Sequence, residues 1–146
     1  MKKVTVTTYR KDKYYPRVVR AIAKVLSKSD VVAPVDVLIE MGNLSKNNHD
    51  AWQQGKIPYL ERVFEGSLSK ANRILRIIGF HVHDLNMGPK ITHYHQRGKG
   101  KKRALQFSKS GDNNIEEAYS RHYLWNQSPE KKQEIIVRSK PGHKIL

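Results

Sequence analysis

The chain contains no cysteine. It therefore has no disulfide bond, no thiolate ligand for a metal ion and no thiol nucleophile, which is typical of a reducing compartment. It also lacks any apolar run near the 18 residues that a membrane-spanning helix needs, and the polar start MKKVTVTTYRKDK has no apolar segment of signal-peptide type. These absences predict a soluble cytoplasmic protein with no membrane partner, associated with the nucleoid if the source is a bacterium.

Acidic residues are scarce relative to basic ones. The 146 residues carry 28 Lys and Arg against 13 Asp and Glu, which gives a net charge of +15. A charge of this size exceeds what solubility requires and favours a polyanionic partner. Nucleic acid is the commonest such partner, because each phosphate that a cation neutralises releases condensed counterions. The length and the 38% hydrophobic content suit a single domain with a modest core, which we place at residues 1–125.

Two segments supply nearly all of the excess positive charge. Residues 1–30 carry nine Lys and Arg against two acids, and residues 67–110 carry ten against one. In the first segment, the sequence predicts a short strand over residues 4–7 and then a helix over residues 16–29. One face of this helix is apolar. The opposite face is wholly basic and consists of Arg17, Arg20, Lys24 and Lys28.

The second basic segment contains a helix followed by a hairpin. Ser67 or Ser69 can cap the helix, and Gly79 lies near its end or weakens it. Its exposed face presents Lys70, Arg73 and Arg76. After a turn at residues 86–89, residues 90–109 form what we call the basic hairpin. Alternation puts Ile91, His93 and His95 on one face of its first arm and Thr92, Tyr94 and Gln96 on the other. The cations of its tip are Arg97, Lys99, Lys101, Lys102 and Arg103.

Between the basic segments, the sequence predicts short helices within a helical core over residues 34–80. The first helix stops at Gly42, the next runs from a cap at Ser45 to Trp52 and is ended by Gly55, and Pro58 opens a third. The stretch LIEMGNLSKNNHDAWQQGKIPYLE, within residues 35–62, resembles the helix-turn-helix of excisionase-like and winged-helix DNA-binding proteins. This resemblance implies an α+β, mostly helical fold with a helix-turn-helix or winged-helix-like core, and binding to DNA.

Two departures from that family favour a different assignment of the parts. Residues 31–66 are net negative, and a further helix separates the helix pair from the basic hairpin. In the alternative, the helix pair is scaffold, the helix of Lys70, Arg73 and Arg76 reads the groove or the phosphates, and the tip of the hairpin is the wing. Helices with a wing suit a major groove and its flanks, so duplex DNA is preferred over RNA.

Histidine spacing raises the question of a metal site. His81, His83, His93 and His95 form two His-x-His pairs, which could surround zinc or copper if both lay on strands. The first pair lies where the preceding helix can continue, and there side chains two residues apart diverge. We therefore predict surface or base-stacking histidines with no metal ion. We also predict no cofactor, because GKGKK lacks the spacing of a phosphate-binding loop.

Two other functions stay open. A metal-independent ribonuclease needs a base, an acid and a cation, which His93 or His95 with Arg97 and Tyr94 could supply. An RNA-binding or assembly subunit of a larger nucleoprotein complex would need a protein partner, and a homodimer is equally compatible with the sequence.

At the C-terminal end, the sequence predicts a helix over residues 113–125 and a partly ordered polar tail over residues 126–146, with a strand-like centre at residues 134–138.

Overall fold

The computed structural model describes residues 3–98 and 102–140, and its fold is α+β, with about half of the chain helical. Within these residues lie six α-helices, two 3-10 helices and one three-stranded antiparallel sheet. In chain order, the elements are η1 (Tyr9–Lys11), α1 (Tyr15–Leu26), β1 (Val31–Val32), α2 (Pro34–Glu40), α3 (Lys46–Gln53), η2 (Leu60–Val63), α4 (Leu68–Asp84), β2 (Gly88–Ile91), α5 (Asn113–Ser120), β3 (Arg121–Leu124) and α6 (Pro129–Arg138).

The first helices begin and end at the residues that local sequence indicates. Pro16 lies in the first turn of α1, and Gly42, whose φ of +81° suits glycine, follows α2. Ser45 and Ser67 cap α3 and α4 by accepting a hydrogen bond from the backbone N–H three residues on. The predicted pair of helices is confirmed as α2 and α3, whereas the helix predicted to open at Pro58 is only the short η2.

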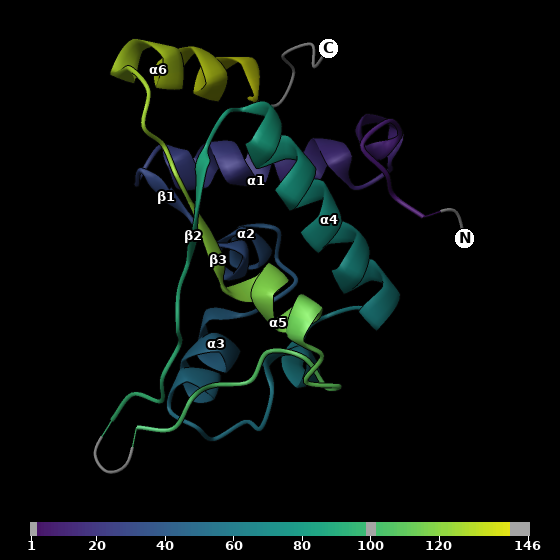
Figure 1. Cartoon of the computed structure of the whole chain (residues 1–146), viewed down its shortest axis with the longest axis vertical. Helices are drawn as coiled ribbons and strands as arrows, with labels where there is room; N and C mark the ends of the chain where they lie inside the picture. Colours follow the sequence, from purple (N-terminus) through teal and green to yellow (C-terminus); the bar gives the residue numbers. More distant parts are fainter. Residues whose placement is uncertain (1–2, 99–101, 141–146) are drawn as a thin grey trace.

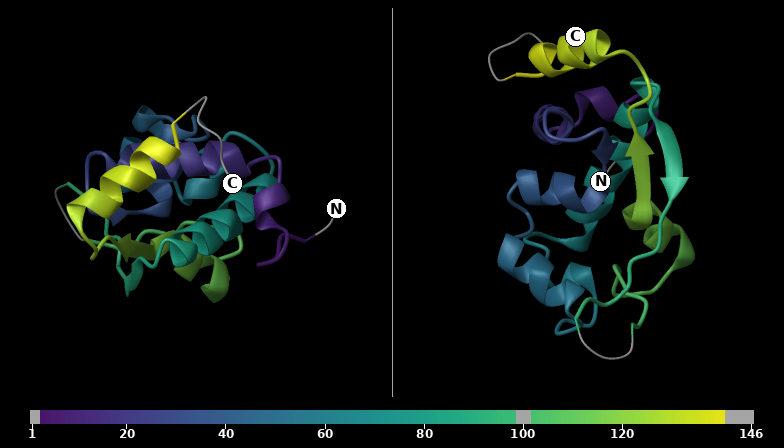
Figure 2. Two further views of the ribbon diagram at one scale, coloured as in Figure 1. Left: turned by 90° about the horizontal axis from the view of Figure 1, so that it is seen from above. Right: turned by 90° about the vertical axis from the view of Figure 1, so that its left-hand side faces the viewer.

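The sheet has the order β1-β3-β2, so the last strand in the sequence is the central one. Val32 and Pro89 both pair with Tyr123, from opposite sides. Figure 2 shows α1, α2 and α3 on one side of the molecule and β2, β3 and α5 on the other. Figure 1 shows α6 at one end of the molecule and the basic hairpin at the other, so the hairpin projects away from the bulk of the fold.

The C-terminal part of the chain corrects three predictions. The helix predicted over residues 113–125 ends at Ser120, and the chain continues as β3. The predicted polar tail contains α6, capped by Ser128, and so the strand predicted over residues 134–138 is wrong. Pairing of β3 on both edges decides the first conformation, which local propensity does not reveal. For α6, the Ser128 cap and Pro129 are local helix signals that the prediction overlooked, and Ile135 packs near α1.

The core contains an aromatic cluster beneath the basic hairpin. Trp52 and Tyr119 are fully buried, and both rings contact Phe107, at centroid distances of 5.0 and 5.3 Å.

The predicted strand over residues 4–7 is instead a turn, although Val4 is buried in the core. No helix among the described residues has the length and apolar character needed to cross a membrane.

Candidate nucleic-acid interface

The predicted basic face of α1 is partly neutralised by its neighbour α2. Lys24 and Lys28 lie 3.7 and 3.1 Å from the carboxylate of Glu40, and Arg17 donates a hydrogen bond to the Met41 carbonyl at 3.0 Å. Arg17, Arg20 and Lys24, but not Lys28, border a small hollow of about 540 Å³ between α1, α2 and α6. The sequence did not reveal this pairing, because the acid comes from a different helix.

The predicted basic face of α4 holds the N-terminal segment. Arg73 forms an ion pair with Asp12, whose side chain is almost completely buried. Arg76 donates from Nε to the Val4 carbonyl at 3.0 Å, and the Lys70 ammonium lies 5.4 Å from the centre of the Tyr14 ring. Each of the three cations therefore makes a contact that secures the fold, in addition to any contact with a ligand.

The alternation predicted for the first arm of the basic hairpin is confirmed. Its side chains are alternately exposed and half-buried from residue 91 to residue 97. The two arms meet at a bridge between His95 and Ala104, and the Gln96 N–H donates to the Arg103 carbonyl at 2.7 Å. Arg97, Lys102 and Arg103 are exposed, while the predicted contacts Lys99 and Lys101 lie outside the described residues.

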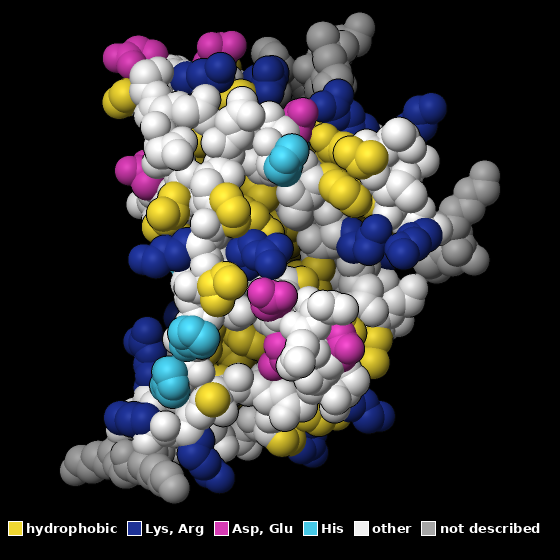
Figure 3. Space-filling view, viewed as in Figure 1, with side chains coloured by type: hydrophobic (Ala, Val, Ile, Leu, Met, Phe, Trp, Pro, Cys, Tyr) yellow, Lys and Arg dark blue, Asp and Glu magenta, His cyan; other side chains and the backbone are white. Residues whose placement is uncertain are grey.

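The three described cations of the tip are not neutralised by any acidic side chain that the structure describes. Among residues 3–98 and 102–140, no Asp or Glu lies within ion-pair distance of Arg97, Lys102 or Arg103. Figure 3 shows dark blue side chains gathered at the lower left, next to two histidines, and a second band of them across the middle of the same face. The hairpin thus keeps the positive charge that α1 partly loses to Glu40.

Acidic side chains fasten the base of the hairpin instead. Glu116 accepts hydrogen bonds from the backbone N–H groups of Phe107 and Ser108, at 2.9 and 2.6 Å. Glu61, which is buried, accepts from the Lys109 N–H and from the Tyr119 hydroxyl, both at 2.9 Å. These carboxylates orient the returning arm, and they lie where the chain enters the core rather than at the tip.

The first arm is joined to the sheet by a tyrosine–histidine contact. The Tyr94 hydroxyl lies 2.6 Å from Nε2 of His122 on β3. Burial raises the pKa of Tyr94 and lowers that of His122, so both groups are neutral at pH 7. Tyr94 is half-buried against His122, whereas His93 and His95 are exposed and lie on the other face of the arm.

The two His-x-His pairs lie in different settings. His81 and His83 are both on α4, where His81 is buried and His83 is exposed, whereas His93 and His95 are exposed on the hairpin arm. Among the described residues, no three His, Asp or Glu side chains gather closely enough to hold a metal ion. The divergence expected for histidines two residues apart on a helix is confirmed for the first pair.

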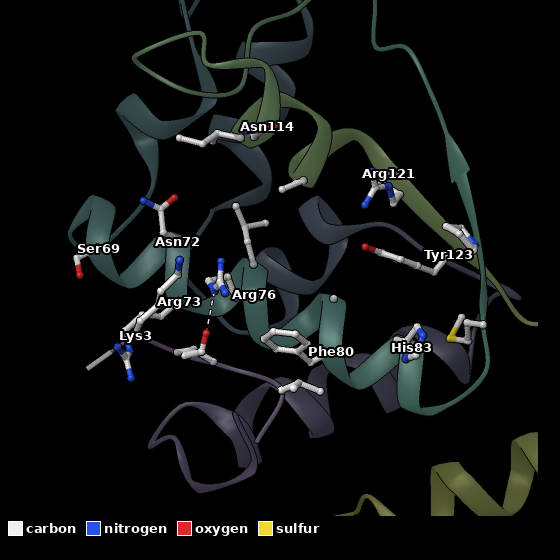
Figure 4. Close-up of a pocket in the computed structure, with 18 residues that line it drawn as sticks. Lys3, Ser69, Asn72, Arg73, Arg76, Phe80, His83, Asn114, Arg121 and Tyr123 are labelled. Carbon is white, nitrogen blue, oxygen red and sulfur yellow. Dashed lines mark hydrogen bonds between the residues drawn. The ribbon is translucent and has the colours of Figure 1, made fainter. Parts of the chain in front are cut away.

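A second hollow, which we call the α4–α5 hollow, has a volume of about 1180 Å³. It lies between α4, the N-terminal segment, α5 and the ends of β2 and β3, and its cationic lining is Lys3, Arg73, Arg76 and Arg121. Figure 4 shows Asn72 and Asn114 towards one end, Tyr123 and His83 towards the other, and Phe80 and Arg76 between them. No residue lining this hollow lines the smaller one beside α1, so Arg73 and Arg76 of α4 lie at a different hollow from the cations of α1, and Lys28 and Lys70 line neither.

Sequence reasoning missed several residues of the α4–α5 hollow. Arg121 belongs to a segment predicted as helix, and Lys3 and Asn114 come from parts of the chain far from α4 in sequence. A helical wheel reports only one element at a time, so no pattern in the sequence could have grouped these side chains.

Comparison of the chain with protein-family models, curated proteins and solved structures finds no match.

Proposed function

We propose that this protein binds nucleic acid, with duplex DNA preferred, and that the basic hairpin makes the principal contact. The observation that carries the proposal is that Arg97, Lys102 and Arg103 are exposed and that no described acid neutralises them, on a hairpin base that two carboxylates fasten to the core. Like charges crowded on one projecting loop repel one another, and a phosphate backbone relieves that repulsion. A pre-oriented loop also loses less conformational entropy on binding than a free one.

Helix α3 would meet the duplex together with the hairpin. The Arg97 N–H donates to the Gln53 carbonyl at 2.7 Å, and the Trp52 indole donates to the Gln106 carbonyl at 2.8 Å. The second helix of the predicted helix-turn-helix is therefore the one beside the hairpin. This supports a winged-helix-like use of α2, α3 and the hairpin, in which α4 is not the reading helix.

Electrostatic attraction in this arrangement comes from the hairpin rather than from α3. Lys46 of α3 pairs with Asp50 at 3.1 Å, and the exposed Asn47 is the polar side chain that could reach a base edge. The hairpin would thus supply affinity through phosphates, and α3 would supply any sequence preference.

A salt titration of binding tests the proposal. Wild type and an Arg97→Gln/Lys102→Gln/Arg103→Gln variant would be titrated with duplex DNA, single-stranded DNA and structured RNA by fluorescence anisotropy. We expect wild type to prefer the duplex. We expect the variant to lose affinity, with the slope of log K against log salt reduced by about 2 to 3, because about 0.9 counterion is released per phosphate contact.

The control removes the same charge elsewhere. Lys11, Lys131 and Lys140 are exposed and distant from the hairpin in sequence, so a Lys11→Gln/Lys131→Gln/Lys140→Gln variant has the same net charge as the hairpin variant. If the two variants lost the same affinity and slope, charge alone would explain binding and the hairpin would not be the contact. No measurable binding to any of the three nucleic acids by wild type would direct attention to a protein partner.

A further inference from the structure

The α4–α5 hollow combines positive charge with an apolar floor. Four cationic residues line it, no Asp or Glu does, and its apolar lining includes Ile115 and Leu75. Its volume of about 1180 Å³ exceeds the roughly 300–1,000 Å³ of typical small-molecule pockets. An apolar acid such as a fatty acid needs cations at one end of its site only. Here, Figure 4 shows arginines along the length of the hollow and amide side chains at one end, an arrangement that suits phosphates next to flat polar rings.

A glycine on the wall of the hollow points to a ligand. Gly79 lies inside α4, a helix of 17 residues, where glycine costs about 0.5–1 kcal/mol relative to alanine. A Cβ added at Gly79 would have the Tyr123 hydroxyl at 3.9 Å as its nearest neighbour, which is an ordinary contact. Packing within the protein therefore does not require glycine here. Its absence of a side chain leaves room for a flat group to lie close to the helix.

The polar groups next to Gly79 suit a nucleotide. Burial raises the pKa of Tyr123. Arg121, which lies beside the Tyr123 hydroxyl, opposes this larger effect. On the other side, the Arg76 guanidinium lies 5.7 Å from the centre of the Phe80 ring. Guanidinium groups contact phosphates and also stack on bases, and the amides of Asn72 and Asn114 can pair with base edges.

We propose that the α4–α5 hollow binds one unpaired nucleotide of the nucleic acid, with the base over Gly79 and the phosphates near Arg76 and Arg121. This inference rests on the proposed function, since it names the form of nucleic acid that the protein prefers. It predicts that a duplex with a single-stranded end binds more tightly than a blunt duplex, for a reason beyond the added phosphate charge.

The test uses the full chain and three DNA probes: a blunt duplex, the same duplex with a three-nucleotide overhang, and the same overhang with its bases removed. The abasic overhang carries the same phosphates, so the ratio between the last two affinities measures base binding alone. We expect wild type to bind the base-bearing overhang about tenfold more tightly than the abasic one, since base contacts are worth roughly 1–3 kcal/mol each. A free mononucleotide is then added as a competitor. Whether it displaces the base-bearing overhang distinguishes binding of a free nucleotide from binding of a nucleic-acid end.

Gly79→Ala and Gly79→Leu supply the decisive variants. Gly79→Ala should raise the melting temperature, because alanine favours the helix, while reducing the tenfold ratio, so loss of folding cannot explain the loss of binding. Gly79→Leu should bring the ratio of the two overhang affinities to about one and leave the affinity for the blunt duplex unchanged. Leu68→Ala, on α4 but outside the hollow, should leave the ratio at its wild-type value.

Failure of this inference differs from failure of the proposed function. If wild type binds blunt duplex with a steep salt dependence but treats the base-bearing and abasic overhangs alike, the hollow does not take a base and the hairpin proposal stands. A Gly79→Leu variant that keeps the wild-type ratio would have the same meaning. If wild type binds none of the probes, both proposals are wrong.

Discussion

His81 is the buried ionisable residue with the clearest consequence for stability. Burial lowers its pKa from 6.5 to about 4, Asp84 opposes this effect, and Arg138 and Arg10 reinforce it. No described group accepts or donates a hydrogen bond at its Nδ1, and its ring contacts Tyr15 edge-on at 5.8 Å. The side chain is therefore neutral in the folded protein at pH 5, whereas in the unfolded chain it is mostly protonated.

The expected outcome is a loss of stability as the pH falls from about 6.5 to about 4. Because the pKa is lower in the folded state, the unfolded state binds the extra proton, and each pKa unit corresponds to about 1.4 kcal/mol, or about 3 kcal/mol in total. Urea denaturation at pH 7 and pH 4.5 measures the change. His81→Met should remove most of this loss, and His83→Gln, a change at the exposed histidine two residues on, should keep it. Equal pH dependence in the two variants would show that other groups carry the effect.

At the scale of elements, the attachment of the basic hairpin depends on α5. Glu116, in the first turn of α5, holds two consecutive backbone N–H groups of the returning arm. Glu116→Gln replaces a carboxylate oxygen with an amide nitrogen, which faces one of these N–H groups and leaves it without an acceptor. We expect the free energy of unfolding to fall by about 2 kcal/mol and the amides of Phe107 and Ser108 to exchange faster with deuterium.

Glu117 offers a matched control at the next position. It is exposed, and its carboxylate lies 3.6 Å from Arg121, a surface pair of little energetic weight. Glu117→Gln should change stability by less than about 0.5 kcal/mol and leave the Phe107 and Ser108 amides protected. If Glu116→Gln behaved in the same way, the returning arm would be held by Trp52 and the core rather than by the carboxylate.

The elements that sequence could predict are those with local signals. Proline and capping serines mark the starts of α1 to α4, glycines with positive φ follow α2 and α3, and period-two alternation marks the first hairpin arm. The end of α4 was not predicted, since the helix continues past Gly79 to Asp84. The segment RHYL was predicted as helix, because its preference for a strand arises from pairing with β1 and β2. The pairing of Lys24 and Lys28 with Glu40 escaped prediction for the same reason, since the partner belongs to another element.

At the scale of the whole molecule, the sheet depends on β3 (Arg121–Leu124), which comes late in the sequence. A fragment of residues 1–120 contains every predicted cationic contact but lacks β3, so β1 and β2 would have no partner, and the buried residues Tyr123, Trp125 and Ile135 would be missing. We expect this fragment to show no cooperative thermal transition by circular dichroism. A fragment of residues 1–140 should unfold like the full chain. A sharp transition for the shorter fragment, within a few degrees of the full chain, would contradict this dependence.

The central position of β3 also sets the order of events during synthesis of the chain. A ribosome releases the basic hairpin before residues 121–124, so the cations reach the solvent before His122 is present to contact Tyr94. Val31 cannot form its strand pairing until Leu124 has been synthesised, so closure of the sheet is a late, long-range step. A newly made chain would therefore contain the cations of the hairpin for a time without the sheet, and a polyanion that met the chain at that stage would meet an incompletely folded protein.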